Sequence, residues 1–272
     1  MDINRTKYIL RSLLLQGFWN YKKMQNVGML FIMYPLLMKL YSSSDRFLRR
    51  AMLRNLDTFN TNPAMVSFCL GALINKEKLL SKMQNNTHIF YEQEKEWFII
   101  RSSVATTVAS LGDRLFWSTL KPLSLVIAFA GLYLGQVYFL NDTPVQSSDS
   151  VILYSLLLAF FAYNIPVFII RYRSFALSYK GTEEDFFGLI NFNWNRLIII
   201  LKTIGQVLTL FVFVYGIYLH FANAVPDAYV ITKVALLSAF IVLSVFIKKW
   251  NIPNLYLYLG SVLVFTLVAL FS

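Results

Sequence analysis

Five long apolar runs in the second half of the chain constrain its fold more than any other feature. They span residues 115–140, 151–170, 197–219, 230–247 and 253–271. A helix needs about 20 mostly apolar residues to cross the hydrocarbon core of a bilayer, and each run is long enough. The sequence therefore predicts an all-α integral membrane protein, in which about five transmembrane helices follow an N-terminal region of a different kind.

The composition supports a membrane protein and argues against a nucleic-acid-binding one. Hydrophobic residues make up 57% of the 272 residues and charged residues only 14%, against roughly 25% charged in a typical soluble domain. The formal net charge is +11, but most Lys and Arg residues precede Arg101 or lie in short turns between apolar runs. Such a distribution is typical of segments that face the anionic inner surface of a membrane. The expected partner of these charges is therefore the lipid bilayer and not nucleic acid.

Loop charges alternate along the second half of the chain. Residues 141–150 and 220–229 contain no Lys or Arg, whereas residues 171–196 and 248–251 contain several. Since positively charged loops stay in the cytoplasm, the pattern predicts a cytoplasmic N-terminal half and a C-terminus outside. Lys233, near the outer end of its run, is the exception, and its long side chain can reach the interface. Arg11 interrupts the first apolar stretch, so no signal peptide is expected.

The first 101 residues consist of shorter and more polar segments than the rest. We expect residues 1–101 to form amphipathic and re-entrant helices at the cytoplasmic face, and residues 102–272 to form the transmembrane region. Residues 5–24 are predicted to be one amphipathic helix that can lie along the inner membrane surface. Its apolar face is predicted to hold four residues at helical spacing: Leu10, Leu14, Tyr21 and Met24.

Three further segments complete the N-terminal region. Residues 27–41 are apolar but too short for a full span, and they contain Pro35, so we expect an interfacial or re-entrant helix. Residues 46–59 carry four arginines, for which a helix facing solvent or headgroups is favoured over a specific binding role. Residues 64–74 are predicted to be a second short apolar helix, and the charged residues 75–96 a cytoplasmic excursion.

Residues 104–122, VATTVASLGDRLFWSTLKP, place an acid–base pair directly after an uncharged run of mostly small residues. Charges at the edge of a membrane segment are costly, so Asp113 and Arg114 are expected to face a partner, a cavity or a substrate. Gly112 beside them allows the backbone to bend or to approach another segment closely. Two interpretations remain open: a re-entrant or broken segment of a transport protein, and a loop-to-helix junction with Asp113 as the N-cap.

Three motifs in the first half of the chain carry a resemblance to a known family. Residues 112–122, GDRLFWSTLKP, resemble the GDSLFWGTLRP signature of the IID membrane component of the mannose–fructose–sorbose family of sugar phosphotransferase systems. Residues 10–28, LRSLLLQGFWNYKKMQNVG, and residues 59–71, FNTNPAMVSFCLG, resemble two further family motifs and occur in the family's order. Together the three cover most of the first half of the chain.

The resemblance implies a function and a set of partners. Members of this family pair with a IIC-type membrane subunit in the bacterial inner membrane, and the IIC–IID pairs assemble into trimers. The sugar crosses through that complex and is phosphorylated at the cytoplasmic face by a soluble IIAB phosphocarrier, which carries the phosphohistidines. The chain is thus expected to be a non-catalytic, multi-pass subunit of a hexose-type sugar permease.

The resemblance also assigns a mixture of structural, partner-contacting and substrate-facing roles to matching positions. These positions are Gln25, Asn26, Asn60, Asn62, Pro63, Asp113, Trp117 and Lys121. Three departures from the family pattern put sugar transport itself in doubt: Arg114 replaces a small residue, Thr106-Thr107 replaces a Gly-Pro pair, and Ser118 replaces a glycine. The alternative hypothesis is therefore a non-transporting membrane scaffold or receptor of the same architecture.

Amides, a carboxylate and an aromatic ring among these positions are the groups that a sugar site requires. Each has a simpler explanation. Asn60 and Asn62 are also typical turn residues, Trp117 is also typical of an interfacial anchor, and Arg114 is expected to pair either with Asp113 or with headgroups.

No pattern typical of catalysis is present in the sequence. His88 and His220 are isolated, neither lies at metal-ligand spacing, and no phosphate-binding glycine loop or nucleophile motif occurs. A single cysteine, Cys69, excludes an internal disulfide and a cysteine metal cage. No cofactor and no metal are expected, and a membrane enzyme is the remotest of the three hypotheses. The mixed-charge residues 171–185 are interpreted as a solvated turn or, less favoured, a docking loop.

Overall fold

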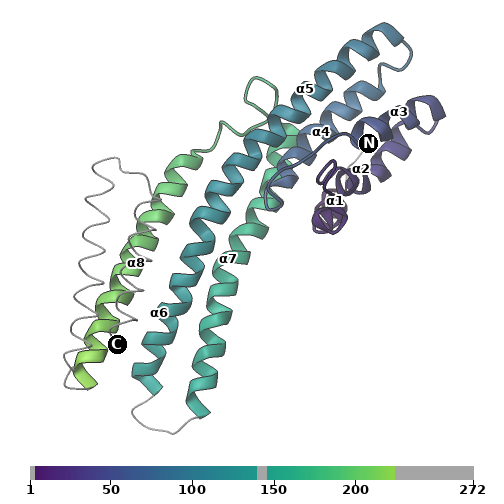
Figure 1. Cartoon of the computed structure of the whole chain (residues 1–272). Coiled ribbons are helices and arrows are strands. Elements are labelled where there is room, and N and C mark those ends of the chain that lie inside the picture. The colour runs from purple at the N-terminus through teal and green to yellow at the C-terminus, as the bar shows by residue number, and fades with distance from the viewer. Residues whose placement is uncertain (1–3, 140–145, 224–272) are drawn as a thin grey trace. The chain divides into compact units, whose positions relative to one another are not determined.

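The computed structural model of the chain describes residues 4–139 and 146–223, which fold into helices joined by turns (Figure 1). The chain divides into one unit of residues 1–208 and a second of residues 209–272, and every contact discussed below lies within the first. Its elements are α1 Arg5–Ser12, the 3₁₀-helix η1 Leu15–Phe18, α2 Asn26–Leu40, α3 Asp45–Asn55, α4 Val66–Ser81, α5 Thr87–Gly112, the π-helix η2 Asp113–Leu120, α6 Lys121–Phe139, α7 Gln146–Lys180 and α8 Trp194–Asn223, which continues beyond residue 208.

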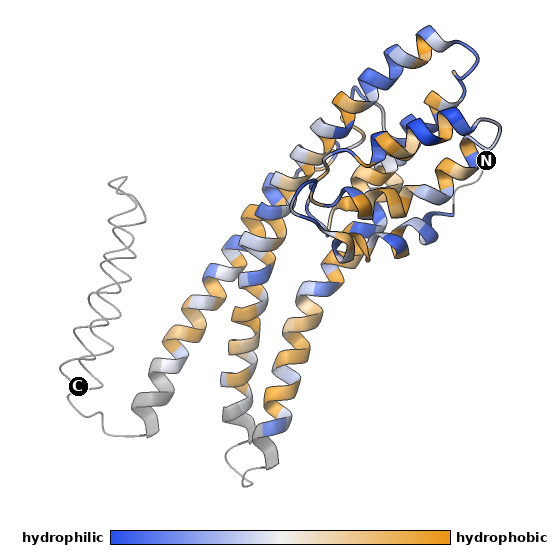
Figure 2. Cartoon of the chain, turned by 45° about the vertical axis from the view of Figure 1, so that its right-hand side comes forward, coloured by the Kyte–Doolittle hydropathy of each residue, from blue (hydrophilic) through white to orange (hydrophobic). Residues whose placement is uncertain are grey.

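Three helical stretches within the described residues are long and apolar enough to cross a membrane. They are Thr87–Gly135, Asp149–Lys180 and Trp194–Gly216, and they contain most of the first three predicted runs. Apolar residues dominate α6, α7 and the described part of α8, whereas hydrophilic residues gather on the N-terminal elements (Figure 2). The prediction of an all-α membrane protein is confirmed. The runs at residues 230–247 and 253–271, Lys233 and the orientation of the C-terminus lie outside the described residues.

The stretch around Gly112 is neither a broken segment nor a loop-to-helix junction with Asp113 as the N-cap, so both of these expectations are wrong; re-entry of this stretch into a membrane stays a prediction. α5, η2 and α6 form one continuous helix, and Asp113 has helical backbone angles, with φ −64° and ψ −41°. The irregularity takes the form of π-helical turns. The hydroxyls of Ser118 and Thr119 donate to the Arg114 carbonyl at 2.8 and 2.7 Å, which supports the widened turns because side-chain donors compete with the regular backbone pattern.

The predicted amphipathic helix over residues 5–24 is shorter than expected. α1 ends at Ser12, and Met24 has a positive φ of 59°, which no helix contains. Asn20 explains the turn, because its side chain accepts from the Lys23 N–H and donates to the Met24 carbonyl. Leu10 and Leu14 of the predicted apolar face do not pack into the protein, since they are 58% and 54% exposed, and their contact with a membrane surface stays a prediction.

The short N-terminal helices are packed into protein. α2 buries Met29, Ile32 and Leu36 despite containing Pro35, and α4 packs against α5 and α7. Gly71 of α4 permits the approach to α7, because a Cβ there would overlap Ser178 Oγ and the Phe175 carbonyl. The depth of these helices relative to a membrane stays a prediction, as does the domain boundary at residues 101/102, which falls inside α5.

Candidate functional site

Residues 56–65, which we call the α3–α4 loop, connect α3 to α4 and contain most of the second sequence motif. The loop is not helical over most of its length, yet Phe59, Thr61 and Asn62 are buried. Buried backbone groups outside regular structure need partners from elsewhere in the protein. Several of these partners are side chains that come from the start of α2, from α5 and from α7.

Gln25 and Asn26, predicted site residues that flank the start of α2, hold the first part of this loop. The Gln25 side chain donates to the Thr61 carbonyl and accepts from the Thr61 N–H, both at 2.9 Å. Asn26 donates to the Leu56 carbonyl at 2.8 Å and accepts from Asn20 at 2.7 Å. Gln25 and Asn26 are only 1% and 5% exposed. Both amides are therefore engaged in holding the fold and offer no free polar face to a ligand.

Two buried arginines complete the support of the loop. Arg101 of α5 donates to the carbonyls of Thr58 and Asp57 at 2.9 and 3.0 Å, just beyond the end of α3. Arg171 of α7 donates to the Pro63 carbonyl at 2.6 Å and to Ser12 Oγ at 2.9 Å. Carbonyl oxygens at a helix C-terminus carry partial negative charge, which suits a cation.

These arginines were missed by the sequence-based reasoning. Arg171 was assigned to a cytoplasmic loop of residues 171–185, which is wrong because α7 continues to Lys180 and buries the arginine. The only available signal was a charge directly after an apolar run, which equally well marks the end of a span.

Asn62 connects the loop to Asp113, a predicted pair of site residues. Its side chain donates to Asp113 Oδ1 at 2.9 Å and accepts from the Ala64 N–H at 3.0 Å. A Cβ at Gly112 would overlap the Asn62 side chain, so the glycine permits the close approach of the two segments. Asp113 is exposed, and its partner is not Arg114, which donates to Asn195 at 3.0 Å instead.

The remaining predicted site residues lie at the surface of the unit. Trp117 is 57% exposed, and the Lys121 ammonium lies 4.5 Å from the centroid of its ring, which is cation–π geometry. Asn60 and Lys121 are also exposed. The predicted site residues thus separate into a buried group that holds the loop and an exposed group that is free to meet a partner or a substrate. The exposed group consists of Asn60, Asp113, Trp117 and Lys121.

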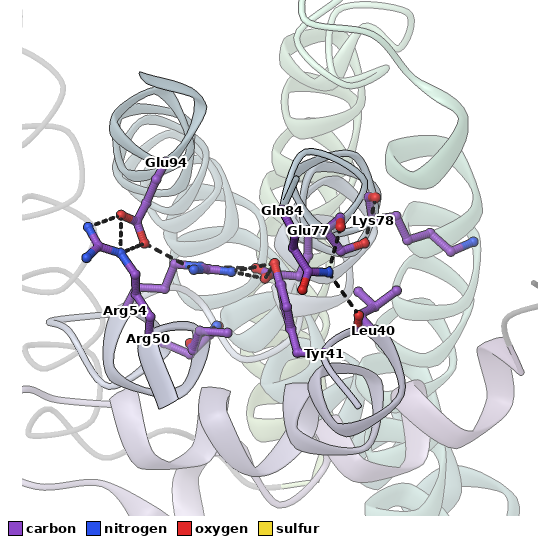
Figure 3. Close-up of polar contacts among 11 residues, drawn as sticks. Leu40, Tyr41, Arg50, Arg54, Glu77, Lys78, Gln84 and Glu94 are labelled. Carbon is purple, nitrogen blue, oxygen red and sulfur yellow. Dashed lines mark hydrogen bonds and ion pairs between the residues drawn. The ribbon is translucent and has the colours of Figure 1, made fainter. Parts of the chain in front are cut away.

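A buried ionic network lies beside the loop and joins α2, α3, α4 and α5 (Figure 3). Arg54 lies between two carboxylates: it pairs with Glu77 and, at 3.1 Å, with Glu94. Tyr41 donates to Glu77 at 2.8 Å and accepts from Arg54 at 2.9 Å. Arg50 lies at the exposed edge of the network, where its Nη2 pairs with Glu94 Oε2 at 2.5 Å.

Electrostatics keeps Arg54 charged and Tyr41 neutral. Burial acts to lower the pKa of Arg54, but the carboxylates of Glu77 and Glu94 outweigh it and raise that pKa above its ordinary value. Burial and the Glu77 carboxylate raise the pKa of Tyr41 well above its ordinary value. The expectation that the arginine-rich helix faces solvent or headgroups is therefore wrong for Arg54. It was wrong because a helix with four arginines looks solvated until its carboxylate partners on other helices are known.

Comparisons with known proteins agree with this architecture. A family model described as "PTS system mannose/fructose/sorbose family IID component" matches residues 2–142. The chain is 32% identical over 134 residues to the mannose-specific EIID component of the phosphotransferase system (PTS) of Escherichia coli K12. That match covers 48% of this chain and 45% of the relative.

Two further matches agree with that family. The chain is 29% identical to the fructose permease IID component of Bacillus subtilis over 126 residues, 46% of this chain and 43% of the relative. The chain thus matches less than half the length of both relatives. A solved structure described as a membrane protein shares the fold, with a TM-score of 0.58 and 21% identity over 96% of this chain and 93% of the other. Because the family model covers more than half of the sequence, the chain belongs to the IID components of the mannose/fructose/sorbose family of PTS permeases.

Proposed function

We propose that this chain acts with a IIC-type membrane subunit to move a hexose-type sugar inward, coupled to phosphorylation by a soluble IIAB phosphocarrier. In this proposal the chain is not catalytic itself and assembles as a trimer of IIC–IID pairs in the bacterial inner membrane. The N-terminal half faces the cytoplasm and the C-terminus faces outside. Family membership over residues 2–142 is the observation that carries the proposal, since that segment contains all the motif residues.

The geometry supports different roles for the motif residues. Gln25, Asn26 and Asn62 hold the α3–α4 loop with both polar atoms of their amides, so we assign them a structural role. Asp113 and Trp117 are exposed although they lie in the motif of the π-helix. An exposed carboxylate and an exposed indole beside apolar helices suit a contact with a second subunit or with sugar hydroxyls. We therefore assign Asn60, Asp113, Trp117 and Lys121 to partner or substrate contacts.

Asp113→Asn tests this assignment because the new side chain can still accept the hydrogen bond from Asn62. The variant removes a negative charge without removing the contact that holds the loop. We expect co-purification with the IIC subunit, or sugar uptake by cells that express the complex, to fall by about tenfold, equivalent to about 1.4 kcal/mol. Asp45→Asn is the matched control, since Asp45 is an exposed carboxylate in the first turn of α3.

The outcomes distinguish the hypotheses. Loss of uptake with retained co-purification assigns Asp113 to the transport path, and loss of both assigns it to the subunit contact. If Asp113→Asn behaves like Asp45→Asn in both measurements, the assignment of Asp113 fails. If the wild-type chain co-purifies with a IIC subunit but supports no uptake, it is a scaffold of the same architecture, as the Arg114 departure allows.

A further inference from the structure

A groove runs between α5 and the segment that leads into α8. One wall is formed by hydroxyl-bearing residues of α5 and by Arg114 of η2, and the other by residues 189–195. Its volume is about 690 Å³, and it opens to the outside of the unit. None of the predicted site residues lines it, so it is a feature separate from the site described above. Its lining consists of Thr106, Thr107, Ser110, Leu111, Arg114, Leu189, Ile190, Phe192, Asn193, Trp194 and Asn195.

Arg114 is the one charged side chain among these eleven lining residues, and no carboxylate accompanies it. Its guanidinium donates through Nη2 to Asn195 Oδ1 at 3.0 Å, which ties the two walls together and fixes the cation at the groove. Within the described residues no ion pair neutralises it. The guanidinium is exposed and keeps further N–H groups for an acceptor. The charge of the groove therefore favours an anionic ligand.

The hydroxyls of the groove suit the oxygens of a phosphate. Thr107 and Ser110 are exposed, lie three residues apart on α5, and make no side-chain hydrogen bond to any residue that the structure describes. Residues three apart on a helix face the same side. An arginine next to two free hydroxyls is a common arrangement for binding phosphate oxygens.

The second wall follows a hydrogen-bonded turn and is apolar at its rim. Phe186 and Phe187, in the turn that precedes it, have positive φ angles of 47° and 57°, a strained conformation for bulky residues that persists only where surrounding contacts enforce it. Asp185 enforces it by accepting from the N–H groups of Thr182 and Gly188 at 2.9 and 2.8 Å. Ile190 and Phe192, in the wall itself, are 70% and 46% exposed. The groove therefore combines a cationic wall with an apolar rim.

The groove adjoins the start of a candidate span, because Trp194 begins both α8 and the apolar stretch Trp194–Gly216. Tryptophan is enriched at the level of lipid headgroups, and basic pockets on the cytoplasmic side of helices bind anionic headgroups. We propose that this groove binds the phosphodiester headgroup of an anionic phospholipid, with Arg114, Thr107 and Ser110 contacting the phosphate and the apolar rim contacting the glycerol and acyl region.

The test uses the full chain purified in detergent, titrated with phosphatidylglycerol or with phosphatidylcholine and followed by native mass spectrometry. We expect phosphatidylglycerol to bind more tightly, and Arg114→Gln to weaken its binding at least about tenfold through loss of a charged hydrogen bond. Arg196→Gln is the control, since Arg196 is exposed two residues after Trp194 and lies outside the groove. Its effect should stay below about fivefold, the non-specific attraction of one charge to the lipid surface.

Thr107→Val is a second variant that leaves the bond between Arg114 and Asn195 in place, and it should weaken phosphatidylglycerol binding without changing the thermal midpoint. The proposal is overturned if the two lipids bind equally, or if Arg114→Gln and Arg196→Gln behave alike. A further arm adds inorganic phosphate or glycerol 3-phosphate. If these soluble anions bind in an Arg114-dependent manner while the two lipids do not differ, the groove is a soluble-phosphate site and the lipid proposal is wrong.

Discussion

Removal of Arg54 should destabilise the first unit more than any other single charge removal in the ionic network. Arg54 and Glu77 have side chains only 2% and 0% exposed, so Arg54→Met leaves a carboxylate in the interior without its cation. Breaking a buried pair in this way costs about 3–5 kcal/mol. Glu94 keeps Arg50 as a partner, so most of this cost is expected to arise at Glu77.

Arg50→Gln is the matched comparison, because the Arg50 side chain is 47% exposed and its loss leaves Arg54 beside Glu94. Half-exposed ion pairs contribute at most about 1 kcal/mol. At about 2–4 °C per kcal/mol for a chain of this size, the thermal midpoint should fall by about 6–20 °C in Arg54→Met and by no more than about 4 °C in Arg50→Gln.

The assay is thermal unfolding of the detergent-purified chain, followed by circular dichroism. Adding Glu77→Leu to Arg54→Met removes the orphaned charge and should recover part of the lost midpoint, since apolar replacements of buried ion pairs are often tolerated. Equal midpoints for Arg54→Met and Arg50→Gln would refute the claim that burial decides the strength of this network. A double variant less stable than Arg54→Met would refute the assignment of the cost to Glu77.

Three further predictions concern glycine, amide and thiol groups of the fold. Gly112→Ala should lower the free energy of unfolding by about 1–3 kcal/mol, because its Cβ clashes with Asn62. Gly205→Ala is the control and should not lower it, since its Cβ would meet only Leu123 at 3.7 Å. Equal thermal midpoints for the two variants would contradict the close approach of Gly112 to Asn62. Gln25→Leu should cost about 1–3 kcal/mol for each backbone group of Thr61 left unpaired, measured by the same unfolding assay, and an unchanged midpoint would remove its structural role. Burial raises the pKa of Cys69 from 9.0 to about 12. Because the folded pKa lies above the unfolded one, the free energy of unfolding falls as pH rises, and between pH 8 and pH 10 the wild type should lose about 1.4 kcal/mol more than Cys69→Ala. Parallel profiles of unfolding free energy against pH would argue against that shift.

Several features of this protein could be predicted from the sequence because each is local. Length and composition alone predict helices at the apolar runs of residues 115–140, 151–170 and 197–219. The structure places α6, α7 and α8 at these runs. The stretch around Gly112 stood out because a charged pair interrupts a neutral run, and the π-helix begins at that pair. The residues of the three motifs were likewise found by order and identity.

Tertiary structure alone decided what those residues contact. Gln25 and Thr61 are 36 positions apart, Asn62 and Asp113 are 51 apart, and Arg54 and Glu77 are 23 apart. The hydrophobic periodicity of a single helix cannot predict pairs that are so far apart in the sequence. Helix periodicity grouped Leu10 and Leu14 on one apolar face, but it did not indicate that Tyr8, Ile9 and Leu15 are the residues of this region that pack into the protein. The physical reason is common to all these cases. Whether a side chain is buried depends on the free energy of its contacts with residues of other helices, and the sequence of a single segment does not contain those residues.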